Sequence, residues 1–235
     1  SITKNGGLRL ALWDDRPSRP TAIILWLFQW LMFRISTGAG LIKVRGSSCW
    51  TEKTCLYYHF ETQPIPSPLS FLYHFLPHSV HRRMVDTDLL VQLYSAWFVL
   101  FPACTAAWLP KSLDRVVRFI VRFGGFLQAG FMVGILLSGN FSVLNHLTIV
   151  PALACLDDAC WPRLLKGRDK SGHQATVPMT RRLVDLALLF LILTLSQPVI
   201  DNLLQRGNRR QMMNSSFDSF RIVNTYGAFG SVGEA

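Results

Sequence analysis

Apolar runs of about the length of a membrane-spanning helix constrain this chain more than any short motif does. A transmembrane α-helix needs about 20 apolar residues, and Thr21 to Val44 is apolar apart from Gln29, Arg34 and Lys43. Only 16% of the residues are charged, against about a quarter in an average soluble domain. We therefore predict an all-α fold, a polytopic transmembrane helical bundle with spans at about 21–44, 89–109, 116–137, 143–156 and 183–204.

The basic residues between these spans predict an orientation. If the spans alternate in direction, segments 1–20, 110–115 and 157–182 share one side and hold twelve Lys or Arg, while the opposite side holds eight. The side richer in Lys and Arg faces the cytosol. The same placement argues against a nucleic-acid partner, although the net charge is +10. We expect a cytosolic segment at 1–20, a transmembrane region at 21–204 with a lumenal loop at 45–87, and the start of a lumenal C-terminal region at 205–235.

Two cysteines in the predicted lumenal loop, Cys49 and Cys55, are six residues apart. A separation of this size can close a disulfide in a turn if the Cβ atoms face each other. A redox-active pair more often has two residues between the cysteines, and a zinc site usually needs two more ligands. We favour a structural disulfide and keep the redox-active pair as an alternative.

Charged residues inside the apolar runs need partners, because an isolated charge is costly in the bilayer. Arg34 lies near the middle of the first span, one helical turn after Trp30, so a cation–π contact is available. Lys43 is close enough to the boundary to extend its amine toward water. On the last span, Asp201 lies at the same level and is a candidate partner for Lys43 or Arg45.

The sequence contains none of the catalytic patterns GxSxG, HExxH or the P-loop. A rival hypothesis is an integral-membrane enzyme or transporter in which Arg34, His59 and Glu61 line a polar cavity. One glycosylation sequon, at Asn214, falls in the predicted lumenal tail and is the better acceptor of the two sequons in the chain.

Three longer strings resemble blocks of the lipase maturation factor family, in the family's order, and the last looks more like the first family member than the second. They are FRISTGAGLIKVRGSSCWTEKTCLYYHFETQPIPSPLS at 33–70, LSGNFSVLNHLTIVPALACLDDA at 137–159 and FDSFRIVNTYGAFGSV at 217–232. Family members have further spans upstream and a sizeable lumenal domain downstream, so we expect a fragment or a truncated form.

The resemblance implies a multi-pass protein of the endoplasmic-reticulum membrane that acts as a chaperone or assembly factor, so we expect no enzyme activity and no cofactor. Its implied partners are secreted dimeric lipases of the lipoprotein lipase class, besides the lipid bilayer. On that reading the loop at 45–87 and the tail present contact surface in the lumen. Aromatic side chains dominate interface energetics, so we expect exposed client-contact anchors at Trp50, Tyr57, Tyr58 and Phe60.

Overall fold

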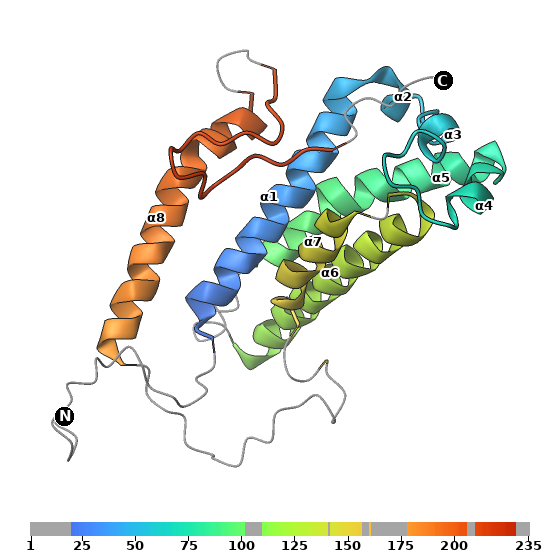
Figure 1. The fold of residues 1–235 in the computed structure, drawn as a ribbon. Helices are drawn as coiled ribbons and strands as arrows, with labels where there is room; N and C mark the ends of the chain where they lie inside the picture. Colours follow the sequence, from blue (N-terminus) through green and yellow to red (C-terminus); the bar gives the residue numbers. More distant parts are fainter. Residues whose placement is uncertain are drawn as a thin grey trace, which may run out of the picture.

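The fold was taken from a computed structural model, which describes residues 20–101, 110–140, 142–156, 160, 178–205 and 210–228. These residues form an all-α protein, as predicted, and the only β-pairing among them is in two isolated bridges. The helices, drawn in Figure 1, are α1 (Ala22–Gly46), α2 (Ser48–Thr51), α3 (Leu56–His59), α4 (Ser70–His74), α5 (His78–Leu89), η1 (Leu90–Tyr94), η2 (Ser95–Leu100), α6 (Lys111–Ser138), α7 (Val143–Leu153) and α8 (Met179–Leu203).

Three helices, α1, α6 and α8, are long and apolar enough to cross a membrane. The shortest of them have 25 residues, which is about 38 Å of helix and exceeds the roughly 30 Å hydrocarbon core. Thr21 begins α1, because its hydroxyl accepts a hydrogen bond from the Ile24 backbone N–H at 3.4 Å. The chain is therefore a membrane protein.

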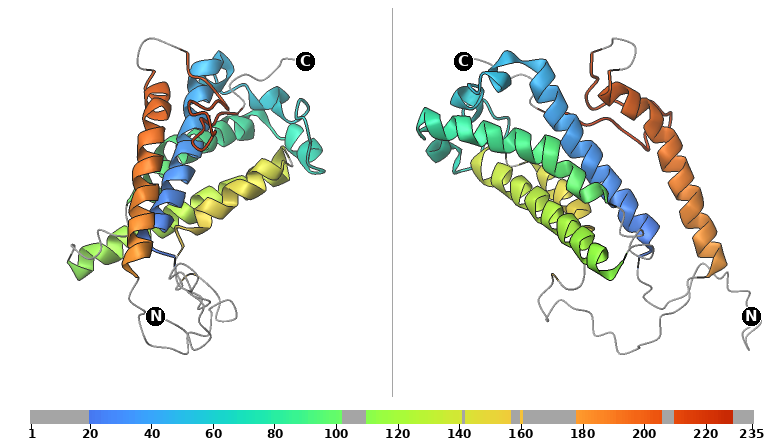
Figure 2. Two further views of the ribbon diagram at one scale, coloured as in Figure 1. Left: turned by 60° about the vertical axis from the view of Figure 1, so that its left-hand side comes forward. Right: turned by 180° about the vertical axis from the view of Figure 1, so that it is seen from behind.

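Helix α1 lies at the centre of the bundle. It packs against η1, η2, α7 and α8, and α6 packs against α7 and η2. Figure 2 shows α8 beside α1 in both views, and the right view shows it on the side away from α6. The main buried cluster joins α1 to η2, α6 and α7 and consists of Met32, Phe33, Ala96, Val99, Val121, Ala152 and Cys155.

The expected span at 89–109 is described only as far as Phe101, since 102–109 lie outside the described residues; in the described part a helix begins earlier, at His78, and becomes irregular at Leu90. The π-helical turn and the 3-10 turn that follow are held by buried polar groups. Gln128 on α6 donates to the Val91 carbonyl at 3.0 Å and to Ser95 Oγ at 3.1 Å. Its carbonyl accepts from Ser36 Oγ at 2.6 Å. One fully buried amide thus joins α1, α6 and the irregular helix.

The expected loop at 45–87 is a small helical subdomain. Its helices enclose a second buried cluster of Trp50, Cys55, Leu56, Phe60 and Val85. Its proline-rich part is tied to the end of α6: the Ser67 backbone N–H donates to the Gly139 carbonyl, and Ser67 Oγ donates to the Leu137 carbonyl, both at 2.7 Å. The folded loop is therefore fixed to the end of α6 near its middle, in addition to its chain connection to α1.

The C-terminal segment, residues 210–228, returns to the middle of α1. Figure 1 shows it crossing from the end of α8 to α1. Its Val223 is buried together with Val199 and Leu203 of α8. At Gly38 on α1, an added Cβ would collide with the Tyr226 carbonyl oxygen. The backbone of this segment can approach α1 so closely because Gly38 has no side chain.

Candidate functional site

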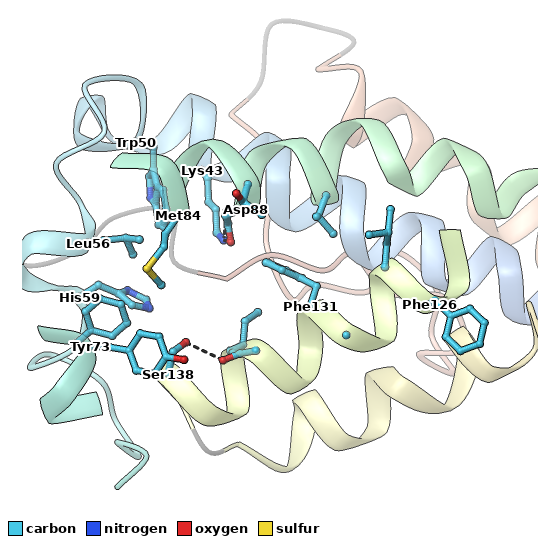
Figure 3. A pocket seen from close by; sticks show the side chains of 18 residues that line it. Lys43, Trp50, Leu56, His59, Tyr73, Met84, Asp88, Phe126, Phe131 and Ser138 are labelled. Carbon is cyan, nitrogen blue, oxygen red and sulfur yellow. Dashed lines mark hydrogen bonds and ion pairs between the residues drawn. The ribbon is translucent and has the colours of Figure 1, made fainter. Parts of the chain in front are cut away.

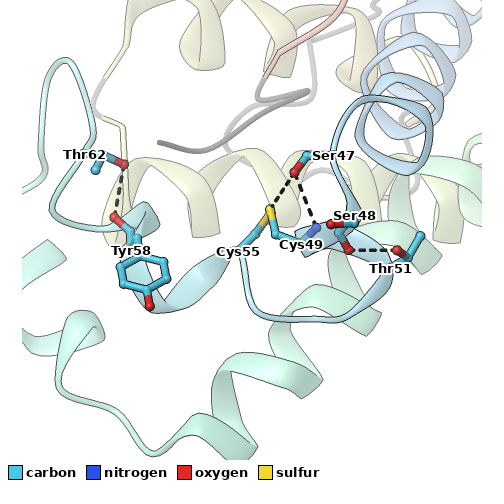
Figure 4. The surroundings of a disulfide bond; sticks show 7 residues. All are labelled: Ser47, Ser48, Cys49, Thr51, Cys55, Tyr58 and Thr62. Carbon is cyan, nitrogen blue, oxygen red and sulfur yellow. Dashed lines mark hydrogen bonds between the residues drawn. A yellow bond between two sulfur atoms is a disulfide. The ribbon is translucent and has the colours of Figure 1, made fainter. Parts of the chain in front are cut away.

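The disulfide between Cys49 and Cys55 closes the turn that follows α1, as predicted. The two Cα atoms are 4.8 Å apart. Ser47 ends α1 in an extended conformation, and its hydroxyl accepts a hydrogen bond from the Cys49 backbone N–H at 3.4 Å. The backbone N–H of Thr54 donates to the Cys49 carbonyl at 2.8 Å. Figure 4 shows the bond between the short helices α2 and α3, where it fixes the direction in which the chain leaves the membrane helix.

The surroundings of this disulfide favour a structural role over thiol exchange. Cys55 is 1% exposed and belongs to the buried cluster of the loop. Exchange requires a thiolate to reach a sulfur atom; burial protects the Cys55 sulfur from such attack and leaves only the partly exposed Cys49 sulfur accessible. Within the described segments, no group of three or more His, Cys, Asp and Glu side chains is arranged to hold a metal ion.

Two of the four predicted contact anchors are buried, so that prediction was wrong for Trp50 and Phe60. Trp50 is 2% exposed and Phe60 is 3% exposed, because both fill the interior of the loop subdomain. The prediction stands untested for the other two. Tyr58 is 39% exposed. Tyr57 is half-buried, stacked on His78 with ring centroids 3.9 Å apart.

Beneath the loop subdomain lies a cavity of about 460 Å³. Figure 3 shows it between the loop, α5 and α6, with Phe126 at the end opposite His59. Its volume falls in the range of small-molecule sites, which are mostly apolar with a few polar groups. The residues of α6 that line the cavity recur every three to four positions, as residues on one face of a helix do. They include Leu127, Gly130, Phe131, Gly134, Ile135 and Ser138.

The polar end of the cavity contains an ion pair. Lys43 Nζ lies 2.7 Å from both carboxylate oxygens of Asp88, and the two side chains are 4% and 14% exposed. The ammonium also lies 4.6 Å from the ring centroid of Trp50. The carboxylate that pairs with Lys43 is thus Asp88 of α5, and not Asp201, the partner expected from the sequence. Arg45 donates to the Leu203 carbonyl and to Gln211 Oε1, each at 2.8 Å.

His59 completes the polar end and is neutral at physiological pH. Burial is the main cause that lowers its pKa to about 3, and the positive charge of Lys43 adds to this effect. An imidazole with this pKa does not act as an acid or a base near pH 7. The polar end therefore combines one paired cation, one paired anion and one neutral ring.

Arg34 lies outside this cavity, so the cavity proposed from Arg34, His59 and Glu61 was wrong for two of its three members. Arg34 is 4% exposed, and its guanidinium donates to the Asn224 carbonyl of the C-terminal segment at 3.1 Å. It lies 6.0 Å from the Trp30 ring, which confirms the expected cation–π contact, and 5.9 Å from the Tyr226 ring. Its role in the structure is to anchor the returning segment to α1.

The sequon residue Asn214 is exposed within this C-terminal segment. Its amide nitrogen donates to the Gly227 carbonyl at 3.1 Å, so glycosylation there remains a prediction. The same segment is folded locally by Asp218, which accepts from the backbone N–H groups of Ile222 at 2.8 Å and Val223 at 3.0 Å. These bonds hold the pKa of Asp218 below its ordinary value, and the bond from the Ile222 N–H has the largest effect.

Sequence reasoning missed the cavity and the role of Asp88. A signal for the ion pair was present, because Lys43 and Asp88 both lie where an apolar run meets the intervening polar loop. Two consecutive spans of opposite direction bring such boundary positions to the same level. No comparable signal marked Gly130 and Gly134, since glycine in a membrane helix is ordinarily read as a packing residue.

Comparison with known proteins identifies the chain's relatives. Residues 10–163 match the model of the lipase maturation factor transmembrane domain. The chain is 42% identical over 232 residues to Lipase maturation factor 1 of Mus musculus and 40% identical over 230 residues to that of Homo sapiens. It is 30% identical over 175 residues to Lipase maturation factor 2 of Gallus gallus, which covers 73% of this chain and 22% of that relative. No solved structure matches.

The two Lipase maturation factor 1 alignments cover 91% of this chain and 37% of each relative, so the chain spans little more than a third of their length. The matched family model lies across α1, the loop subdomain, the cavity and α6. Identity to the first family member exceeds identity to the second, as the resemblance of the last block suggested. The chain therefore belongs to the lipase maturation factor family, with its folded loop and its cavity inside the family's transmembrane domain.

Proposed function

We propose that this chain is part of an endoplasmic-reticulum membrane factor that helps secreted lipases, including dimeric lipases of the lipoprotein lipase class, reach their active folded state without itself catalysing a reaction. The observation that carries the proposal is membership of a family whose relatives are named for lipase maturation. Those names describe proteins of which the chain covers 37%, so the proposal concerns the membrane part of such a factor.

The Cys49–Cys55 disulfide supports a lumenal position for the loop subdomain, since disulfides persist in the oxidising lumen and are rare in the cytosol. The excess of Lys and Arg on the opposite side supports the same orientation. The C-terminal segment lies at the end of α8, on the loop's side of the bundle in Figure 1. Both would then face the compartment in which secreted lipases fold.

Helix α4 supports a position of the loop subdomain at the membrane surface. Phe71, Leu72 and Phe75 are 61–69% exposed, and α4 is joined through Ser67 and Ser70 to the turn at which α6 ends. Aromatic side chains at that level are typical of the membrane–water interface. The water-facing surface left for a client includes Tyr58 and the charged groups around Lys53 and Asp86, whose side chains are 43% and 53% exposed.

A domain exchange tests the proposal. The region of the mouse Lipase maturation factor 1 that matches this chain is replaced by the chain, and the chimera is expressed with lipoprotein lipase in cells that lack their own factor. We expect secreted, active lipase. A chimera that is stable in the endoplasmic reticulum and yet leaves the lipase inactive would contradict the proposal.

A pair of substitutions in the chimera locates the contact surface. Tyr58→Ala is expected to lower the yield of active lipase, because it removes an exposed aromatic ring from the loop subdomain. Tyr94→Ala is the matched control, since Tyr94 is a 69% exposed tyrosine on η1, outside that subdomain. Equal lipase yields from the two variants would exclude Tyr58 as an anchor.

A further inference from the structure

The glycines of α6 have two distinct environments. An added Cβ at Gly124 would lie 2.8 Å from Phe98 Cβ, and one at Gly125 would lie 2.5 Å from Cys155 Cβ, so these glycines allow close helix packing. At Gly130 and Gly134 an added Cβ would meet nothing within 4 Å. Both of these line the cavity. The missing side chains leave cavity volume there and serve no close helix contact.

The cavity is an apolar recess with an open side, since Gly130 and Gly134 are themselves exposed on α6. Its volume of about 460 Å³ lies in the range of small-molecule sites. Each glycine within a helix also costs roughly 0.5–1 kcal/mol relative to alanine. Two such glycines beside one recess keep its apolar floor accessible to a molecule that enters from the open side.

The walls of the cavity select an apolar body. Phe126, Leu127, Phe131 and Ile135 of α6 face Val91 and Met84 across it. Phe126, at the end away from the loop, is 54% exposed on a helix long enough to span the membrane. An occupant can therefore enter from the hydrocarbon region of the bilayer.

The polar end selects an uncharged head that can donate a hydrogen bond. Lys43 is neutralised by Asp88 at 2.7 Å. An anionic head would therefore be repelled by the Asp88 carboxylate, and a cationic head would be repelled by the Lys43 ammonium. The Asp88 side chain is 14% exposed, against 4% for Lys43, and its carboxylate is the more accessible group. A hydroxyl can donate to that carboxylate while adding no charge.

We propose that this cavity binds a neutral membrane lipid with a hydroxyl head, placing the hydroxyl at Asp88 and the apolar body along Gly130 and Gly134 of α6. A sterol and a diacylglycerol both have this chemistry. The site does not depend on the proposed role in lipase maturation, because it rests on the cavity and its ion pair alone.

Photoaffinity labelling tests the proposal with the full-length protein purified in detergent. The probes are photoactivatable cholesterol, photoactivatable diacylglycerol and photoactivatable palmitic acid. We expect the cholesterol probe, the diacylglycerol probe or both to label peptides of α6 more strongly than the palmitic acid probe does. Whichever of the two hydroxyl probes labels more strongly identifies the lipid class that occupies the cavity. Equal or stronger labelling by palmitic acid would overturn the proposal.

Cavity-filling variants give the second test. Gly134→Leu should reduce labelling by the hydroxyl probe at least about tenfold, the ratio that about 1.4 kcal/mol of lost binding free energy produces. Val133→Leu is the matched control, because Val133 is 43% exposed on the same helix and does not line the cavity. Undiminished labelling of Gly134→Leu would overturn the proposal, and Gly130→Leu repeats the test if Gly134→Leu does not fold.

A change of specificity provides a test that a structural role alone would not mimic. Asp88→Asn leaves the Lys43 ammonium without its anion. The polar end then carries a net positive charge, and labelling should shift from the hydroxyl probe toward palmitic acid. A variant that stays folded and keeps the preference of the wild type would overturn the assignment of Asp88 as the group that receives the head.

Discussion

The Cys49–Cys55 disulfide has a calculable effect on the loop subdomain. In the chain-entropy model, closing a loop of six residues lowers the conformational entropy of the open chain, which corresponds to about 2.2 kcal/mol of free energy. That free energy corresponds to a change of about 40-fold in the opening equilibrium of the loop. We therefore expect Cys49→Ala, which removes the bond at its more exposed end, to raise the local opening equilibrium by that factor.

Hydrogen exchange of the purified protein in detergent measures this opening. The amides of Thr54 and Cys55 report it directly, because both donate to the Cys49 carbonyl, at 2.8 and 3.2 Å. If the opened loop closes again faster than its amides exchange, the exchange of these two amides should accelerate about 40-fold in Cys49→Ala. Peptides from the C-terminal segment should exchange unchanged, since that segment does not contain the disulfide.

Two comparisons separate a structural bond from a redox-active one. Reduction of the wild type should reproduce the exchange rates of Cys49→Ala, and the variant itself should not respond to the reductant. An acceleration below about threefold would refute the entropic account. Mixed disulfides with lipase, trapped in a Cys55→Ser form, would instead show that the pair exchanges with clients.

Three further results are expected. Gln128→Leu should destabilise the bundle by about 1–3 kcal/mol in denaturant unfolding, because buried polar partners on α1 and η1 lose their bonds; Gln128→Glu, which keeps one acceptor, tests whether the donated bonds matter. Gly38→Ala should expose the C-terminal segment to proteolysis through its backbone clash, whereas Gly130→Ala, with open space, should not. The pKa of His59 is about 3 in the folded protein and about 6.5 in the unfolded chain, so between pH 6.5 and pH 3 only the unfolded loop binds the proton. The free energy of unfolding should therefore fall by up to about 1.4 kcal/mol per pH unit as the pH is lowered through that range. His59→Gln should flatten that part of the profile of thermal stability against pH.

Local sequence features predicted the elements whose cause is itself local. The length and low charge of the apolar runs predicted an all-α membrane protein, and the short spacing of Cys49 and Cys55 predicted their bond, since a six-residue turn can close on itself without help from distant segments. The same holds for Trp30 and Arg34, which face one another one helical turn apart. Long strings of residues also identified the family.

The tertiary structure decided which side chains are buried and which charges are paired. In a membrane helix both the lipid-facing and the protein-facing sides are apolar, so hydrophobic periodicity does not reveal the inward face. The sequence therefore did not indicate that Gly130 and Gly134 open onto a cavity. Outside the membrane helices, the burial of Trp50 and Phe60 depends on how the loop packs on α5, and the boundary positions of Lys43 and Asp88 gave their common level but not their contact. Each of these depends on contacts between segments far apart in the chain, which are determined only when the helices pack together.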